Sequence, residues 1–289
     1  MIEKTFVKTF PSNTQESQPG IEEKMNPKPI YASKEYSFNG NRLKGKVAII
    51  TGGDSGIGRA ISIAYAREGA KVAIFYLNED EDAKRTKEII EEIGGECVLI
   101  SGDIGNEEFC KDSIKYIINQ YNKLDILVCN AGEQHYSKTL EEITLQQLDN
   151  TFKTNVYGTI FMIKASLPYL KEGSSIIITT SVTAYKGNET LIDYSSTKGA
   201  LTSLTRSLSL NLASKGIRVN AVAPGPIWTP LIPSTFPAEE ILKFGSDTAF
   251  KRAGQPVEVA EAYVFLASQG ASFITGETIH VNGGVFVNC

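Results

Sequence analysis

A tyrosine and a lysine stand four positions apart in the segment Tyr194-Ser195-Ser196-Thr197-Lys198. This spacing places both side chains on one face of a helix, one turn apart. Free tyrosine has a pKa of ~10 and exchanges protons poorly at neutral pH. A neighbouring ammonium favours the phenolate and lowers that pKa, so the pair could carry acid–base chemistry. The alternative for the pair alone is a tyrosine and a lysine on a solvent-exposed helix face.

A glycine-rich stretch nearer the start of the chain could bind an anion. It is Thr51-Gly52-Gly53-Asp54-Ser55-Gly56-Ile57-Gly58, and it separates an apolar run from a segment with helical apolar spacing. Gly52 permits a tight turn, Gly56 lets the backbone approach a pyrophosphate, and Gly58 lets the helix pack close to the strand. The N–H groups and dipole at the helix start would then bind a dinucleotide diphosphate. The alternative is an ordinary glycine-rich turn between strand and helix.

Strand-like and helix-like segments alternate along the chain and would position these residues. Strands are predicted over 46–51, 71–76, 96–101, 124–129, 174–180, 217–222 and 278–282, and helices over 57–69, 80–93, 106–121, 144–171, 194–214 and 256–268. This alternation, with continuous apolar runs such as Ile176-Ile177-Ile178, indicates a parallel sheet covered on both faces. We therefore predict an α/β fold, a single doubly wound (Rossmann) domain of about seven strands, over residues 43–289. Ligands of such sheets bind at the carboxyl ends of the strands.

Polar residues follow three of the predicted strands at that edge. Asp103 comes after the third strand and could accept a hydrogen bond from an adenine amino group, or simply cap a helix or form a turn. Asn130-Ala131-Gly132 follows the fourth strand, where small residues would let the backbone approach a ribose and a nicotinamide, unless it is a plain turn. Ser181 ends the fifth strand, thirteen residues before Tyr194.

Composition excludes several function classes. The chain has 289 residues, a net charge of −4 and no basic run, so we expect no nucleic-acid partner. No apolar stretch approaches the roughly 18 residues that a membrane span needs. The four cysteines and two histidines show no metal-ligand spacing, and we predict no metal site. Cys97 and Cys129 fall in apolar runs and are interpreted as buried thiols of a cytoplasmic protein.

The first 42 residues differ in composition from the rest. Four prolines break a polar segment of low periodicity, which predicts little regular structure. One interpretation is a disordered tail. We favour an extended arm that packs on the body through its apolar residues, Ile21, Met25, Ile30, Tyr31, Tyr36 and Phe38.

Together these motifs resemble the short-chain dehydrogenase/reductase family, over roughly residues 43–289. The glycine stretch, Asp103, Asn130-Ala131-Gly132, Asn155, Ser181, Tyr194, Lys198 and Pro224-Gly225-Pro226-Ile227 occur in family order. The proline-broken leader is similar to that of a branch containing bacterial general-stress oxidoreductases and aldehyde-reductase-like proteins. Cys129 replaces the first Asn of the common Asn-Asn-Ala-Gly motif, and we expect its side chain to face the core.

The resemblance implies an NAD(P)-dependent oxidoreductase that transfers a hydride between a nicotinamide and an alcohol, aldehyde or ketone. In this interpretation Tyr194 exchanges a proton with the substrate oxygen. Lys198 lowers the pKa of Tyr194 and holds the nicotinamide ribose, Ser181 hydrogen-bonds the substrate oxygen, and Asn155 orders a water that relays protons. Two alternatives are a catalytically silent NAD(P)-binding sensor or scaffold, and an epimerase or dehydratase, whose relatives usually have a larger C-terminal domain.

The resemblance also implies where the cofactor and substrate lie. Cofactor-binding positions are Gly52, Asp54, Ser55, Gly56, Ile57, Gly58, Tyr76, Leu77, Asp103, Ile104, Asn130, Ala131, Gly132, Tyr194, Lys198, Pro224, Gly225 and Ile227. The loop from Pro224 to about Phe250 would close over a substrate with apolar character through Trp228, Leu231, Ile232, Phe236 and Phe244, unless these residues only pack the loop. Family members of this type are usually tetramers, so we expect a homotetramer.

The choice between NAD and NADP depends on charge near the second strand. Tyr76 stands where an NAD enzyme usually has a carboxylate, about 20 residues after the glycine turn. The cations that would bind a 2′-phosphate are also missing, and acidic residues such as Asp54 and Glu79 surround the region. We expect Arg59, the one nearby cation, on the solvent side of its helix. Repulsion of the phosphate then favours NAD.

Overall fold

The strands of the sheet are short runs rich in isoleucine, valine and alanine, and most are buried along their length. The computed structural model describes residues 9–16, 18–31 and 40–287. Its strands are β1 (Val47–Thr51), β2 (Lys71–Tyr76), β3 (Cys97–Ser101), β4 (Ile126–Cys129), β5 (Ser175–Thr179), β6 (Arg218–Pro224) and β7 (Thr278–Val281). They pair in parallel in the order β3-β2-β1-β4-β5-β6-β7. The predicted doubly wound parallel sheet of seven strands is confirmed.

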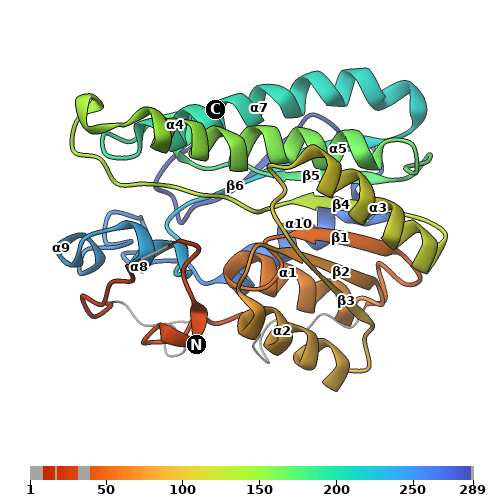
Figure 1. Cartoon of the computed structure of the whole chain (residues 1–289), viewed down its shortest axis with the longest axis horizontal. Coiled ribbons are helices and arrows are strands. Elements are labelled where there is room, and N and C mark those ends of the chain that lie inside the picture. Colours follow the sequence, from red (N-terminus) through yellow and green to blue (C-terminus); the bar gives the residue numbers. More distant parts are fainter. Residues whose placement is uncertain (1–8, 17, 32–39, 288–289) are drawn as a thin grey trace.

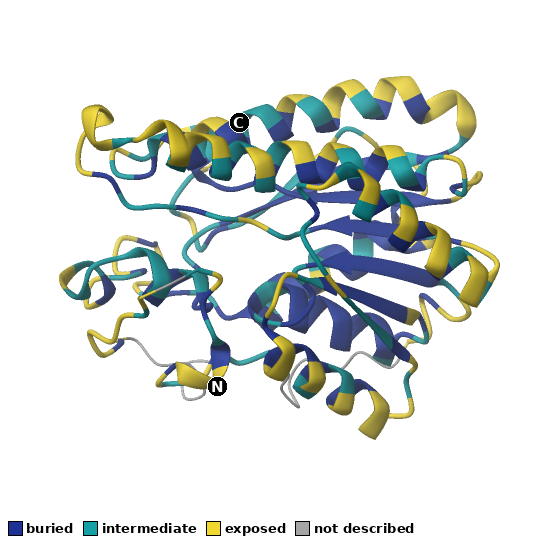
Figure 2. Ribbon diagram, in the orientation of Figure 1, coloured by how far each residue is buried: buried dark blue, intermediate teal, exposed yellow. Residues whose placement is uncertain are grey.

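Helices cover both faces of this sheet (Figure 1). They are α1 (Gly56–Arg67), α2 (Asp80–Glu92), α3 (Glu107–Tyr121), α4 (Leu145–Phe152), α5 (Thr159–Ser166), α6 (Thr183–Lys186), α7 (Ile192–Leu212), α8 (Leu231–Thr235), α9 (Ala238–Ile241) and α10 (Pro256–Ala267). Successive strand residues point to opposite faces. Ala48 and Ile50 therefore pack in the core under α1 and α10, whereas Val47 and Ile49 pack in the core under α3, α5 and α7. The helices turn their buried faces to the sheet and their exposed faces outward (Figure 2).

The predicted helix over 144–171 differs from the structure. It is three consecutive segments, α4, a π-helical turn over Lys153–Gly158, and α5. π-helical turns often occur at functional sites because the extra residue re-aims a side chain. Asn155 lies in this turn and is completely buried. The short helices α6, α8 and α9 were not predicted, because four or five residues are too few to show a periodicity.

The described part of the N-terminal segment packs along the body. Phe10 stacks on Trp228, with ring centroids 4.0 Å apart, and Met25 is buried in the same cluster. The indole N–H of Trp228 donates to the Pro27 carbonyl at 2.8 Å. Ile30 packs against the core under α10. Tyr36 and Phe38, two of the predicted anchors, lie outside the described residues.

Cysteine side chains add to both cores. Cys97 and Cys129 are buried, and burial raises the pKa of each thiol above its usual range. Cys129 packs under α3 and α5, so the expectation that it faces the core is confirmed. Within the described residues, no group of His, Cys, Asp and Glu has the arrangement of a metal site. Over the same residues, no helix combines the length and apolarity that crossing a membrane requires.

Candidate active site

A cavity of about 800 Å³ opens where the strands end. Its walls are the turn after β1, the ends of β2 and β3, and the segments that follow β4, β5 and β6. Among the predicted site residues, Gly58 and Asn155 are the two that do not line it. The predicted residues that line it are Gly52, Asp54, Ser55, Gly56, Ile57, Tyr76, Leu77, Asp103, Ile104, Asn130, Ala131, Gly132, Ser181, Tyr194, Lys198, Pro224, Gly225 and Ile227.

The glycines of the β1–α1 turn are required by close backbone approach. Gly52 has φ +60°, and a Cβ there would lie 3.0 Å from the Ala131 Cα. A Cβ at Gly58 would lie 1.7 Å from the Gly52 carbonyl oxygen, so only glycine lets α1 begin so close to β1. The N–H of Gly56 donates to the Glu22 carboxylate at 2.7 Å. The helix start is therefore partly capped by the N-terminal segment, which the sequence did not predict.

Tyr194 and Lys198 share one face of α7, as their spacing predicts, and both are buried. The Lys198 ammonium lies 5.4 Å from the Tyr194 ring centroid and donates to the Thr179 carbonyl at 2.9 Å. Burial raises the pKa of Tyr194 to about 12, and a hydrogen bond with Ser181 opposes this. Burial also lowers the pKa of Lys198 to about 8. The expected lowering of the Tyr194 pKa by Lys198 is absent here, because the ammonium faces the ring and a carbonyl, and burial dominates.

Ser181 and Asn155 are held by their neighbours. The Ser181 hydroxyl lies on the cavity wall, where its oxygen accepts the Thr183 N–H at 3.1 Å. The Asn155 amide binds both backbone groups of Glu133, accepting from its N–H at 2.8 Å and donating to its carbonyl at 2.9 Å. It also donates to the Thr197 hydroxyl, one residue before Lys198, at 3.0 Å. Asn155 thus joins the segment after β4 to α7 from behind the cavity wall.

Carboxylates concentrate at the far end of the cavity, near Tyr76 and Leu77. Asp54 and Glu79 are both buried and line the wall. Burial, and then the charge of Glu79, raise the pKa of Asp54 to about 7. Asp103 also lines this end, where it accepts the Gly105 N–H at 2.7 Å and pairs with Lys153 at 2.7 Å. It does not cap α3, since Asn106 does.

The burial of Arg59 differs from the prediction. This residue was expected on the solvent side of its helix, but it is 2% exposed and has partners on every side. The guanidinium donates to the Asp54 carbonyl at 2.9 Å and to the Thr86 hydroxyl at 2.6 Å, and it pairs with Glu22 and Asp82. The sequence predicted an exposed Arg59 because the segments that cover it, the N-terminal segment and α2, are distant from it in the chain.

The position of Trp228 also differs from the prediction, which placed it over the substrate. Trp228 does not line the cavity, because Phe10, Met25 and Phe244 surround its ring beneath the N-terminal segment. The other apolar residues of the loop do line the cavity, namely Leu231, Ile232, Phe236 and Phe244. Ile232, Phe236 and Phe244 also pack in the cluster around Trp228, so these residues both pack the loop and line the cavity, whereas Trp228 only packs the loop.

Gln18 and Glu133 are among the lining residues that sequence reasoning missed. Gln18 hydrogen-bonds both the N–H and the carbonyl of Gln134, so the N-terminal segment forms part of the wall. Glu133 binds Thr154 at 2.9 Å and His135 at 2.7 Å while its backbone holds Asn155. The position of Glu133 directly after Asn130-Ala131-Gly132 was a usable signal. Gln18 had none, because its partner lies more than a hundred residues away.

Comparison with known proteins identifies the family of the chain. The family model described as "Enoyl-(Acyl carrier protein) reductase" matches residues 52–286. General stress protein 39 of Bacillus subtilis (strain 168) is 55% identical over 98% of both chains. This chain is a short-chain dehydrogenase/reductase. NADPH-dependent aldehyde reductase 1, chloroplastic, of Arabidopsis thaliana is 50% identical over 95% of this chain and 97% of that one. The crystal structure of a Burkholderia cenocepacia short-chain dehydrogenase with NADP superposes with a TM-score of 0.80, at 31% identity, covering 84% and 99% of the two chains.

Membership makes the chain an NAD(P)-dependent oxidoreductase, as predicted. The residues present fit a nicotinamide dinucleotide. Lys198 is buried at the wall with one hydrogen-bond acceptor in the described part of the chain, which leaves ammonium donors for ribose hydroxyls. A Cβ at Gly132 would stand 3.5 Å from this ammonium, so its absence leaves room beside it. The comparisons give no support to a catalytically silent sensor.

Proposed function

We propose that the protein interconverts an aldehyde or ketone and the corresponding alcohol, with NAD(H) as the preferred cofactor. The observation that carries the proposal is that Tyr194 and Ser181 lie together on the wall of one cavity, which apolar side chains of the loop after β6 also line. A carbonyl oxygen placed between the two hydroxyls would have a proton donor and a second hydrogen bond. The relative from Arabidopsis is named an aldehyde reductase, which supports the substrate class.

The chain's own residues divide the work. Tyr194 exchanges a proton at the substrate oxygen, and Ser181 holds that oxygen by a hydrogen bond. Lys198 holds the nicotinamide ribose and adds a positive charge near the Tyr194 ring, 5.4 Å from its centroid. Asn155 fixes the segment after β4. The ordering of a water on the proton path is the role that the family resemblance implies for it. When bound, the nicotinamide supplies or accepts the hydride.

The preference for NAD rests on the charge at the far end of the cavity. Asp54 and Glu79 face the region beside Tyr76 and Leu77 where the adenosine ribose binds in sheets of this type. Their carboxylates accept hydrogen bonds from ribose hydroxyls and repel a 2′-phosphate. The Burkholderia structure contains NADP, and the Arabidopsis relative is named for NADPH. The preference for NAD is therefore measured directly in the experiment below.

Assembly as a homotetramer is part of the same proposal. Large apolar side chains are exposed on the outer surface of α4, the π-helical turn and α5, and on α7. They are Leu145, Leu148, Tyr157, Ile160 and Leu210. Exposed large apolar side chains on neighbouring helices often mark a surface that a partner covers. We propose a second copy as that partner, in the cytoplasm, with residues 43–289 as the catalytic domain and residues 1–42 as its arm. Light scattering that gave a monomer at micromolar concentration would contradict the assembly.

A substrate panel tests the activity. Purified protein is mixed with NADH or NADPH and with aldehydes and ketones of increasing apolar size, and absorbance of the reduced nicotinamide is followed. The reverse direction uses the alcohols with NAD or NADP. We expect turnover of aldehydes with apolar side chains, faster with NADH at equal concentration. Absence of turnover across the panel, while both dinucleotides bind, would contradict the substrate class.

A further inference from the structure

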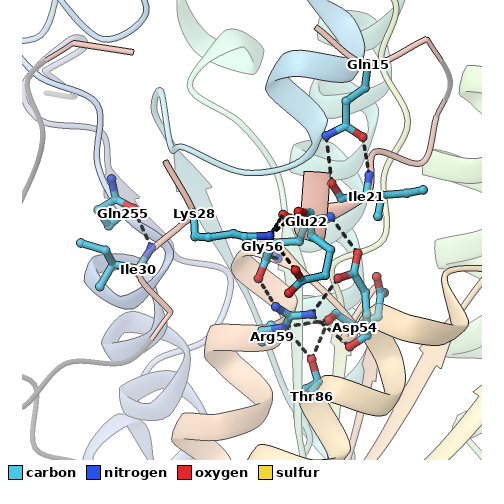
Figure 3. Close-up of polar contacts among 12 residues, drawn as sticks. Gln15, Ile21, Glu22, Lys28, Ile30, Asp54, Gly56, Arg59, Thr86 and Gln255 are labelled. Carbon is cyan, nitrogen blue, oxygen red and sulfur yellow. Dashed lines mark hydrogen bonds and ion pairs between the residues drawn. The ribbon is translucent and has the colours of Figure 1, made fainter. Parts of the chain in front are cut away.

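One buried side chain of the N-terminal segment, Glu22, lies behind the dinucleotide end of the cavity wall, against Gly56 and Arg59 (Figure 3). Its carboxylate accepts the Gly56 N–H at 2.7 Å and forms an ion pair with Arg59. Its own N–H donates to the Asp82 carboxylate at 2.8 Å, and Asp82 pairs with the same guanidinium at 3.1 Å. Two carboxylates from distant parts of the chain thus share one arginine. The arm brings one of them, and α2 brings the other.

Arg59 lies directly behind the cavity wall. Its Nε donates to the carbonyl of Asp54, a lining residue, at 2.9 Å. The Thr86 hydroxyl donates to the same carbonyl at 2.6 Å. The ring of Tyr31, also from the arm, lies 5.2 Å from the guanidinium carbon. The guanidinium is therefore one residue removed from the space that an adenosine ribose would occupy, and its charge acts there across a buried, weakly screened medium.

The arm changes the net charge of this region. Without Glu22, the pair of Arg59 and Asp82 is neutral, and the carboxylates of Asp54 and Glu79 are the nearest charges on the wall. With Glu22, the cluster of Glu22, Arg59 and Asp82 carries one net negative charge when its carboxyls are ionised. Burial raises the pKa of Glu22 to about 7 even though Arg59 and the Gly56 N–H favour the charged form, so the charge of this carboxyl is favoured by a pH above that value. The nearby charges on the arm, Glu23 and Lys28, pair with each other at 2.8 Å on the surface.

We propose that Glu22 is a specificity-determining residue for the dinucleotide, one that disfavours the 2′-phosphate by adding a negative charge to the pair of Arg59 and Asp82 behind the cavity wall. The inference rests on the dinucleotide site proposed above. It assigns to the arm a part in cofactor choice, in addition to its contacts with the substrate loop. A 2′-phosphate adds negative charge that NAD lacks, so a change in local charge acts more strongly on NADPH than on NADH.

The test is a ratio of dissociation constants. NADH and NADPH are titrated into the full-length protein at pH 8, and binding is followed by nicotinamide fluorescence, with no substrate present. Glu22→Gln keeps the side-chain shape and an oxygen acceptor for the Gly56 N–H but removes the charge. We expect it to shift the ratio toward NADPH by at least about threefold, as removal of one partly screened unit charge predicts. Glu22→Asp, which keeps the charge, should leave the ratio closer to that of the wild type.

The matched control is Glu23→Gln, which removes the same charge from the next residue. The Glu23 side chain is 62% exposed and pairs with Lys28, so its charge is screened and the ratio should stay within about 1.5-fold of the wild type. Equal weakening of both dinucleotides by Glu22→Gln would show a purely structural role and overturn the proposal, as would no change. A wild type that prefers NADPH would contradict the proposed NAD preference but not this inference, which concerns the shift.

Loss of folding is checked by circular dichroism and thermal melting. If Glu22→Gln does not fold, Asp82→Asn removes the other carboxylate from the same guanidinium, and the proposal requires the same direction of shift. Asp82 belongs to α2 and not to the arm. A shift with Asp82→Asn and none with a folded Glu22 variant would therefore assign the effect to α2 alone and overturn the role of the arm.

Discussion

The two ends of the cavity handle buried charge in opposite ways. At the nicotinamide end, the buried Lys198 ammonium has one hydrogen-bond acceptor among the described residues, the Thr179 carbonyl, and burial lowers its pKa to about 8. At the adenosine end, the Arg59 guanidinium is equally buried but is bound by two carboxylates, a hydroxyl and two carbonyls. A buried charge with unused donors is held ready for a ligand, whereas the Arg59 guanidinium, with two carboxylates and three further acceptors around it, holds the structure together.

The nicotinamide end should give the largest effect. Tyr194→Phe removes the transferable proton and preserves the ring, so we expect turnover on a confirmed substrate to fall by ~10²–10⁴-fold. Dinucleotide affinity should remain close to that of the wild type, because the ring still fills its place on α7. Steady-state rates and a dinucleotide titration measure both. Turnover at the native rate would remove Tyr194 from the mechanism.

Arg59 should give the largest effect on stability. Arg59→Met leaves the carboxylates of Glu22 and Asp82 buried without their cation, and breaking a buried pair in this way costs about 3–5 kcal/mol. Urea unfolding followed by circular dichroism, at fixed protein concentration, measures the loss. A loss below about 1 kcal/mol would mean that water or relaxation satisfies the carboxylates, and the contrast between the two ends would fail.

Replacing Lys198 should raise the stability of the protein, whereas replacing Arg59 should lower it. Burial disfavours the charged form of Lys198, so below the folded-state pKa of about 8 the ammonium destabilises the native protein by on the order of 3 kcal/mol. Between that pKa and the unfolded value the unfolded chain binds more protons, so this penalty disappears as pH rises toward 10.5. We expect Lys198→Met to abolish most turnover and yet to unfold at a higher temperature than the wild type at pH 7.

The comparison of melting temperatures is repeated at pH 10, where the advantage of the Lys198→Met variant should shrink. Other groups titrate equally in both proteins and cancel in the difference. A variant that is less stable at pH 7 would show that the hydrogen bond to the Thr179 carbonyl outweighs the burial of the charge.

The smallest effect belongs to the exposed ion pair of the arm. Lys28→Gln removes the ion pair with Glu23. The Lys28 side chain is 47% exposed and the Glu23 side chain is 62% exposed. Exposed pairs contribute about 0–1 kcal/mol, so the unfolding midpoint should hardly move. Comparing the stability of this variant with that of Arg59→Met shows whether a charge pair stabilises the arm because it is buried or simply because it is a pair. A loss as large as that of Arg59→Met would show that burial is not the deciding factor.

Local spacing determined much of this protein. The seven strands follow from short apolar runs, and Tyr194 and Lys198 meet because four residues make about one helical turn. Glycine is required at position 58 because any Cβ there would clash with the Gly52 carbonyl, a contact within the same strand–helix turn. Most predicted cofactor positions line one cavity because parallel strands end at the same edge of the sheet.

Tertiary structure decided the rest. Whether Arg59 faces water depends on Glu22 and Asp82, and whether Trp228 faces the cavity depends on Phe10. The pKa of Tyr194 depends on how deeply α7 is buried, which its sequence spacing does not encode. In each case a short sequence pattern fixes which face of an element a side chain occupies, but the segment that covers that face comes from elsewhere in the chain. Solvent exposure, and with it the electrostatic character of each buried group, is set only when the distant segments pack.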